Sequence, residues 1–183
     1  MADFSYRVIR SSRRTLALEI TPTGEVLVRC PRRCSNAQIA AFVQSKADWL
    51  QKHLAKRAAR PQLPPLTAEE VQSLAQQALQ DLPVRVTRFA ALVGVVPGRI
   101  TIRSQRTRWG SCSSKGSLNF NCLLMLTPPD VRDYVVVHEL CHRKEMNHSA
   151  RFWAEVERVL PDYRIRRKWL KDHGNELMAR LGQ

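Results

Sequence analysis

The spacing of apolar and polar side chains in the first third of the chain predicts strands followed by a helix. Three β-rich segments occupy residues 5–9, 15–20 and 25–30. A basic turn and the turn signal Pro22-Thr23-Gly24 separate them, which predicts an antiparallel meander. Ser35 and Gln38 then form a capping box, and apolar residues recur at helical spacing to about Ala58. We expect this helix to dock on the meander with Trp49 in the core.

A second helix and a second β-rich region follow a proline-containing break. The break, residues 61–65, is too short to be a domain linker. Thr67 and Glu70 form another capping box, and the apolar stripe after them predicts a helix that ends near Pro83. Further strand-like segments cover residues 84–89, 99–103, 108–112 and 118–126. Helices and strands thus alternate in blocks, which is typical of an α+β protein.

Length and composition are those of a globular domain. The 183 residues are 44 % hydrophobic and 25 % charged, which excludes a disordered chain. We expect one domain over residues 1–183, with a β-rich lobe containing two helices at 1–126 and a helical lobe at 127–183.

The N-terminus lacks a signal-peptide core and no apolar run is long enough to cross a bilayer, so the expected location is the cytoplasm. The five cysteines form no C-x-x-C pair, which favours reduced thiols.

The positive charge of the chain is its most unusual global property. Lys and Arg number 30 against 16 Asp and Glu, which gives a formal net charge of +14. The arginines gather at Arg7, Arg10, Arg13, Arg14, Arg29, Arg32 and Arg33, and at Arg99, Arg103, Arg106 and Arg108. Such a surface attracts phosphates, nucleic acid or acidic partners, but it is equally explained as a solvated surface without a dedicated partner. No DNA- or RNA-binding motif accompanies it, so weak phosphate or nucleic-acid binding is the most that the charge predicts.

The segment YVVVHELCHRKEMNH, residues 134–148, carries the most specific chemical signal. It contains His-Glu-x-x-His at His138, Glu139 and His142. Two histidines four residues apart lie on one face of a helix, where both imidazoles can bind one metal ion. Glu139 can then take the proton of water bound to that ion, as in zinc hydrolases. The helix start Thr127-Pro128-Pro129-Asp130 and the apolar run after it place the motif on a buried helix.

A catalytic zinc needs a third protein ligand and one open position for water. His148 is preferred, because a neutral imidazole beyond the end of the helix suits zinc and because Asn147 tolerates the left-handed conformation that turns a chain back. Glu145, on the same helical face, and Glu155, on the next predicted helix, remain alternatives. Cys141 lies about 100° around the helix from the second histidine, so we expect it in the core.

Three stretches of the chain together carry a family resemblance. They are HELCHRKEMNHSARFW, RWGSCSSKGSLNFN and YRVIRSSRRTLALEI…GEVLVRCP. The chain resembles, over nearly its whole length, the YgjP-like metal-dependent hydrolases, bacterial relatives of the small gluzincin-type zinc metallopeptidases. The resemblance implies one zinc ion on His138, His142 and His148, with Glu139 as general base. It also implies an antiparallel β-rich N-terminal half packed against a zincin-like helical half. Because a gluzincin uses glutamate as third ligand, Glu155 stays open and so does the sub-class of the site.

The stretch RTRWGSC, residues 106–112, is the second chemical signal. Glycine beside tryptophan and arginines indicates close approach of backbone or ligand, with a bulge that buries Trp109 in the core as the alternative. In zincin-like enzymes a strand before the active-site helix borders the substrate groove, and this stretch stands in that place. The resemblance therefore favours substrate binding by Arg106, Arg108 and Trp109.

Two further helices are expected after the motif, one capped by Ser149 and one by Asp162. They would hold His148 in place. Glu155 is the acidic residue best placed to support the metal ligands if it is not itself a ligand. Tyr163 either packs in the core or donates a hydrogen bond to a developing oxyanion.

Three classes of function are compatible with these residues. A zinc metallopeptidase is favoured, because the histidine–glutamate helix most often serves amide hydrolysis. A nucleoside triphosphate pyrophosphohydrolase acting on UTP and related nucleotides is second, supported by the arginines and by the association of YgjP-like proteins with nucleotide hydrolysis. The chain lacks a G-x-x-x-x-G-K-S/T loop, which weakens that hypothesis. A basic nucleic-acid-binding module with a structural metal is third. The expected substrate is thus a peptide or a nucleotide, and no membrane partner is expected.

Overall fold

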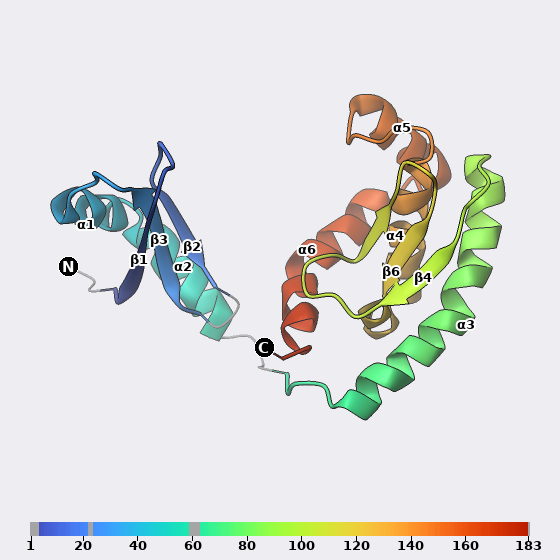
Figure 1. Cartoon of the computed structure of the whole chain (residues 1–183), viewed down its shortest axis with the longest axis horizontal. Coiled ribbons are helices and arrows are strands. Elements are labelled where there is room, and N and C mark those ends of the chain that lie inside the picture. Colours follow the sequence, from blue (N-terminus) through green and yellow to red (C-terminus); the bar gives the residue numbers. More distant parts are fainter. Residues whose placement is uncertain (1–3, 22–23, 59–62, 183) are drawn as a thin grey trace. The chain divides into compact units, whose positions relative to one another are not determined.

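The computed structural model describes residues 4–21, 24–58 and 63–182, and the chain divides into two compact units (Figure 1). The units are unit 1 (Met1–Gln62) and unit 2 (Leu63–Gln183). The mixed α+β class is confirmed. The boundary falls in the proline-containing break rather than at the expected lobe boundary after residue 126. The physical reason is that the second sheet contacts helices both before and after it in sequence, so it packs with them in unit 2.

Unit 1 contains a three-stranded sheet whose central strand is the most apolar one. The strands are β1 (Tyr6–Ser11), β2 (Ala17–Ile20) and β3 (Val26–Pro31), in the order β1-β3-β2. β3 pairs in parallel with β1 and antiparallel with β2, so the expected meander is wrong. Val26, Leu27 and Val28 are consecutive and all buried, so both faces of β3 are covered, which favours its central place. Of the predicted turn, Pro22 and Thr23 lie outside the described residues.

Two helices follow this sheet where the sequence predicts one. They are α1 (Asn36–Gln44) and α2 (Ala47–Ala58). The predicted capping box is confirmed, since Ser35 Oγ accepts from Gln38 N and the Gln38 side chain accepts from Ser35 N. Leu50 takes the buried position on α2, whereas Trp49 is 40 % exposed and stacks on His53, so its expected core position is wrong. The buried core of unit 1 consists of Val26, Val28, Cys30, Ile39, Val43 and Leu50.

Unit 2 begins with a long helix, α3 (Ala68–Val93), which starts at the second predicted capping box and continues through Pro83. The expectations of a helix end near Pro83 and of a strand over 84–89 are wrong. Proline within a helix costs about 3 kcal/mol. Each further buried apolar side chain contributes roughly 1.5–3 kcal/mol, so continuing the stripe offsets that cost. The buried stripe consists of Leu74, Ala78, Leu82, Val86, Phe89, Ala90 and Val93. The helix ends at Gly94, where φ is 77°.

The second sheet is also mixed. Its strands are β4 (Ile100–Arg103), β5 (Gly110–Cys112) and β6 (Leu118–Asn121), in the order β4-β6-β5. β6 pairs in parallel with β4 and antiparallel with β5. Each sheet thus holds one parallel and one antiparallel pair, and the purely antiparallel arrangement is wrong. β5 is an edge strand that contacts the helix carrying the HExxH segment. The 3₁₀ helix η1 (Cys122–Leu126) leads from β6 into that helix.

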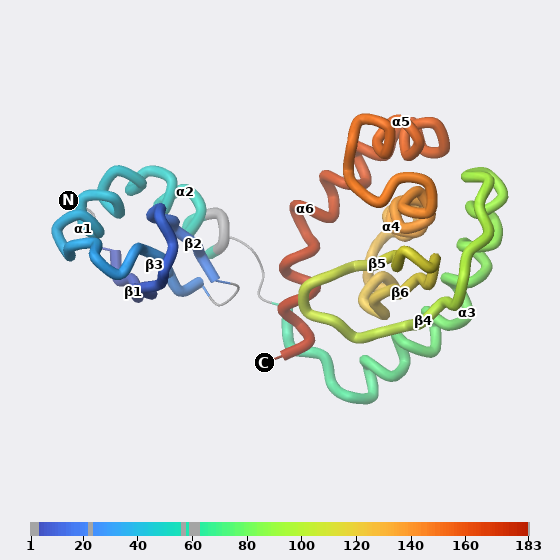
Figure 2. Tube along the Cα trace, turned by 45° about the horizontal axis from the view of Figure 1, so that its top comes forward, coloured from blue at the N-terminus to red at the C-terminus, as the bar shows by residue number. Residues whose placement is uncertain are grey.

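α4 is the central helix of unit 2. It spans Pro129–Cys141 and contacts α3, β5, α5 (Ala150–Val159) and α6 (Tyr163–Ala179). Figures 1 and 2 both show α3 and α6 on opposite sides of it. As predicted, its apolar residues Val131, Tyr134, Val135, Val137 and Leu140 are buried. A search of the described helices finds none with the length and apolar character needed to cross a membrane.

Candidate metal centre

The HExxH segment lies at the C-terminal end of the buried helix α4. His138 and Glu139 belong to its last turn, and His142 is its C-cap. Because residues four apart share a helical face, Tyr134, His138 and His142 lie one above another. Glu139 is 5 % and His142 9 % exposed, whereas Cys141 is fully buried in the core, as predicted. The helix therefore presents two imidazoles where the core meets the surface.

The turn after α4 brings His148 back to these two histidines. Asn147 does not adopt the expected left-handed conformation, because no described residue other than glycine has a positive φ. Its Oδ1 instead accepts a hydrogen bond from Ser149 N at 3.2 Å. Ser149 caps α5 as predicted, with its Oγ accepting from Phe152 N. Hydrogen bonds between side chains and backbone thus fix the turn without a left-handed residue.

Three imidazoles converge at this point. One ligand atom from each of His138, His142 and His148 lies within 4.8 Å of the others. The Nε2 atoms of His138 and His148 are 3.0 Å apart. Two nitrogens bound to one tetrahedral zinc lie about 3.3 Å apart, since each Zn–N bond is about 2.0–2.1 Å. His142 Nδ1 donates to the Glu145 carbonyl at 3.1 Å, which leaves the Nε2 lone pair for a metal. The donor set fits a tetrahedral divalent ion with one open position.

Aromatic rings pack around the three imidazoles. Phe152 is fully buried, and its ring centroid lies between 4.6 and 4.9 Å from each imidazole centroid. Trp153 stacks on His148 at 5.7 Å and lies 5.9 Å from His138. Tyr134 meets His138 edge-on at 5.8 Å. These rings restrict the rotation of the imidazoles and so preorganise them.

The surroundings of the histidines favour their neutral form. Burial, followed by the neighbouring imidazoles and Arg167, lowers the pKa of His138 to about 3. Burial also lowers the pKa of His142. The His138 Nδ1 atom is buried and finds no hydrogen-bond partner within the described part of the chain. Since neutral imidazole is the form that binds metal, His138 and His142 have the required protonation at neutral pH.

Glu139 is a buried acid beside the histidines. Burial raises its pKa to about 8, against the opposing effect of the positive charge of Arg108. Gly110 of β5 makes room for it, because a Cβ at Gly110 would lie 2.7 Å from both Cγ and Oε1 of Glu139. The glycine of RTRWGSC therefore marks a close approach, and the approaching group is the Glu139 side chain. A pKa near neutrality suits a group that takes and returns a proton.

The two rival metal ligands lie outside this group. Glu155 forms salt bridges of 2.6 Å with Arg158 and Lys144, which lower its pKa to about 2. It thereby ties the turn after α4 to α5. Glu145 contributes its backbone carbonyl, which accepts from His142. Within the described residues, the three histidines are the only group of three or more potential ligands close enough to share an ion.

The three substrate-binding candidates are not all at this site. Arg108 is exposed and its charge acts on Glu139. Trp109 is half-buried against the core, and a Cβ at Gly174 of α6 would lie 3.1 Å from its Nε1. Its position therefore agrees better with the alternative of core packing than with substrate binding. Arg106 lines a separate depression of about 390 Å³. The other residues lining it are Leu66, Thr67, Ala68, Val71, Ser104 and Leu181. Of the three, only Arg108 is shown to act on a residue of the HExxH segment.

The aromatic residues around the site include one that the sequence singled out, Tyr163, and others that it did not. Tyr163 is 4 % exposed and stacks on Trp153 at 5.4 Å and on Tyr134 at 6.5 Å, which agrees with its core alternative. Burial raises the pKa of Tyr134 to about 12, so its hydroxyl stays protonated. Tyr134 could have been found, since it precedes His138 by four residues on the same helical face. No local signal marks Trp153 or Arg167, because tertiary packing alone brings them to the histidines.

The chain has matches among protein families and among solved structures. Two solved structures, both of metallopeptidase zymogens, are 22 % identical to the chain. Abylysin from Pyrococcus abyssi gives a TM-score of 0.45 over 49 % of this chain and 92 % of its own. Jannalysin from Methanocaldococcus jannaschii gives 0.43 over 50 % and 92 %. A search of curated proteins found no match. A family model described as YgjP-like, metallopeptidase domain, matches residues 14–73 and 71–173, and the chain therefore belongs to the YgjP-like family.

Proposed function

We propose that the protein is a zinc-dependent hydrolase that cleaves peptide bonds. The observation that carries this proposal is the convergence of three imidazoles beside a buried carboxylate, in a member of a metallopeptidase-domain family. The proposed ligands of the single zinc ion are His138, His142 and His148. When bound there, zinc lowers the pKa of a water molecule and polarises a carbonyl group.

Glu139 is the proposed general base. It takes the proton of the attacking water and passes it to the leaving amine. A divalent cation on the adjacent histidines favours the ionised carboxylate and so counteracts the effect of burial on its pKa. Gly110 is needed because any side chain there would displace Glu139. Glu155 supports the site indirectly, since its salt bridges hold the turn that carries His148.

The edge strand β5 is the proposed binding surface for the peptide backbone. It contains Gly110, contacts α4 and has a neighbour only on its β6 side in the described sheet. An extended peptide can add to such an edge by main-chain hydrogen bonds, which places a scissile bond beside Glu139. Arg108 is exposed, and its charge acts on Glu139. It is the proposed polar contact of the substrate.

The proposal is tested with purified protein loaded with zinc. We expect close to one equivalent of zinc, cleavage of unstructured peptides, and no release of pyrophosphate from the four ribonucleoside triphosphates. Glu139→Gln should keep the zinc and lose at least about 100-fold in peptide cleavage, the lower range for loss of a general base. Zinc content by atomic absorption and cleavage by mass spectrometry provide the readouts.

Glu157→Gln is the matched control, because Glu157 is a half-exposed acid of α5 whose salt bridge within the described residues is with Arg164. It should retain both zinc and activity. Pyrophosphate release that depends on Glu139, with a KM for nucleotide raised tenfold or more in Arg108→Ala, would instead establish the nucleotide hypothesis. Zinc below about half an equivalent after metal-replete expression would contradict a tight site with three ligands.

A further inference from the structure

Arg167 of α6 lies one aromatic ring away from the histidine site. Its guanidinium carbon is 4.4 Å from the centroid of Trp153. The same ring stacks on His148 and lies 5.9 Å from His138. The positive charge of Arg167 also lowers the pKa of His138, and it opposes the burial that raises the pKa of Tyr134. The arginine therefore borders the proposed metal centre without belonging to it.

Within the described residues Arg167 forms no salt bridge, unlike the neighbouring arginines. The paired arginines of this region are Arg158 with Glu155, Arg164 with Glu157 and Arg166 with Asp162. Arg167 is exposed, and its guanidinium contacts the indole of Trp153. A guanidinium stacked on a ring keeps its in-plane N–H groups free to donate. The arginine is thus oriented by Trp153 and available to an anion.

Arg108 cannot replace Arg167 in this respect. Arg108 acts on the carboxylate of Glu139, so its charge is partly used within the protein whenever that acid is ionised. Arg167 acts on the imidazole of His138 and the phenol of Tyr134, which are neutral groups, so its charge is left for the substrate. Arg108 therefore interacts with an acid of the protein, whereas Arg167 can bind an acid of the substrate.

We propose that Arg167 binds a carboxylate of the substrate, so that the site prefers peptides with a negative charge close to the scissile bond. The inference rests on the proposed peptidase function. A guanidinium presents a planar fork of donors that matches a carboxylate bidentately. The carboxylate belongs either to an Asp or Glu side chain or to the C-terminus of the peptide, and both present the same chemistry to Arg167.

A first experiment measures binding without turnover. Acetohydroxamate and succinyl monohydroxamate have the same zinc-binding group, but only the second carries a carboxylate. Zinc-loaded wild type should bind the second roughly 10- to 100-fold more tightly in a calorimetric titration, as expected for a charge-assisted bidentate contact. Arg167→Gln should lose this preference with its zinc content unchanged, and Arg167→Lys should recover part of it.

Lys168→Gln is the control for net charge, since Lys168 is the next residue on α6 and pairs with Asp172. It should keep the preference. Equal affinity of wild type for the two hydroxamates, or a preference that survives Arg167→Gln, would overturn the inference. Failure of the zinc-loaded protein to bind either hydroxamate would overturn the inference together with the metal site on which it stands.

A second experiment separates the two sources of the carboxylate and the two proposals. Three peptides of one sequence are compared: neutral with an amidated C-terminus, the same with one internal Glu, and neutral with a free C-terminus near the cleaved bond. A higher kcat/KM for the second or the third, lost in Arg167→Gln, supports the inference and names the source. Equal cleavage of all three overturns it and leaves the peptidase proposal standing. No cleavage, with the hydroxamate preference intact, rejects the peptidase proposal but supports a carboxylate site at Arg167.

Discussion

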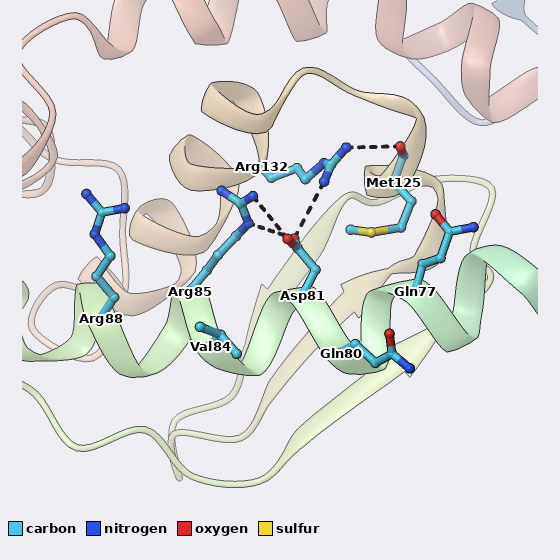
Figure 3. Close-up of a pocket in the computed structure, with 8 residues that line it drawn as sticks. All are labelled: Gln77, Gln80, Asp81, Val84, Arg85, Arg88, Met125 and Arg132. Carbon is cyan, nitrogen blue, oxygen red and sulfur yellow. Dashed lines mark hydrogen bonds and ion pairs between the residues drawn. The ribbon is translucent and has the colours of Figure 1, made fainter.

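Two polar clusters of unit 2 share the helix α4 but differ in how their polar atoms are satisfied. The arginine–aspartate cluster consists of Asp81, Arg85, Arg132 and Asp133. The histidine site consists of His138, His142, His148 and Glu139. The first borders a depression of about 610 Å³ (Figure 3). That depression is lined by Gln77, Gln80, Asp81, Val84, Arg85, Arg88, Met125 and Arg132.

In the arginine–aspartate cluster the charges are matched inside the protein. Arg85 donates to Asp81 through Nε at 2.6 Å and through Nη2 at 3.0 Å, and it also pairs with Asp133 of α4. Arg132 donates to the Thr127 carbonyl and approaches Asp81 to 3.7 Å. Figure 3 shows both guanidinium groups turned toward the Asp81 carboxylate. The cluster therefore joins α3 to α4 and leaves little unpaired charge for a ligand.

In the histidine site several polar atoms are poorly satisfied within the protein. The Nε2 atoms of His138 and His148 lie 3.0 Å apart, where one ring must donate to the other unless a metal ion binds both, and Nδ1 of His138 is buried without a partner in the described residues. Glu139 is buried with a raised pKa. Such groups cost stability unless a ligand satisfies them. The comparison teaches that matched charges hold this fold together, whereas unmatched ones mark the place of its chemistry.

The largest effect that would test this contrast is loss of the metal itself. Removing one imidazole by His142→Ala leaves two ligands, so zinc affinity should fall by more than the roughly 10- to 100-fold that follows loss of an outer hydrogen-bond partner. A competition titration with a zinc chelator measures it. His173→Ala is the matched control, because His173 is exposed on α6, packs its ring against Trp169 and is not one of the three grouped histidines. Unchanged zinc affinity in His142→Ala would contradict the assigned ligand set.

A second effect concerns stability in the metal-free protein. The pKa of Glu139 is raised from 4.5 to about 8 in the folded state, so between these values the folded chain holds more protons than the unfolded chain. Stability due to this group is fully present below about pH 4.5 and falls as the pH rises toward 8. A glutamine at position 139 does not titrate, so the variant does not lose this stability as the pH rises. The stability of Glu139→Gln relative to wild type should therefore rise from pH 5 to pH 8, by at most roughly 1.4 kcal/mol per pH unit.

Urea unfolding at pH 5, 6.5 and 8 in the presence of a chelator measures this difference. Glu155→Gln provides the opposite case, because salt bridges lower the Glu155 pKa to about 2. Its contribution is present above about pH 4.5 and is lost only as the pH falls toward 2, so its effect should be constant across this range. A pH-independent difference for Glu139→Gln would show that the carboxyl group is not buried in its acid form.

Local chemistry explains which features could be predicted from sequence. Capping boxes, such as that of Ser35 and Gln38, depend on residues three apart and are confirmed. The HExxH spacing likewise needs only one helix to place His138 and His142 together, and Cys141 follows from the same periodicity. Bringing the third histidine to the others required only a turn of a few residues.

Features decided by tertiary packing could not be predicted in this way. α3 continues through Pro83 because its apolar stripe finds a core beyond the proline. Strand order in unit 1 follows from which strand is buried on both faces, and hydrophobic spacing alone does not reveal that. The same limit applies to the site, where Gly110 meets Glu139 and Arg167 meets Trp153 only after distant elements have packed.

The smallest effect that would sharpen the contrast is expected in the arginine–aspartate cluster. Arg85→Ala leaves Asp133 without its salt bridge and weakens the hold on Asp81, whose side chains are 17 % and 28 % exposed. The cost should be about 2 kcal/mol, between the value below 1 for surface pairs and the 3–5 for fully buried ones. Zinc affinity should not change, because no residue of this cluster is a proposed ligand. Arg88→Ala, one turn further along α3, removes an exposed guanidinium whose contact within the described residues is the Phe89 ring, and it should cost below about 0.5 kcal/mol. Urea unfolding and zinc titration of both variants test the contrast, which would fail if Arg85→Ala lost zinc affinity or proved as stable as Arg88→Ala.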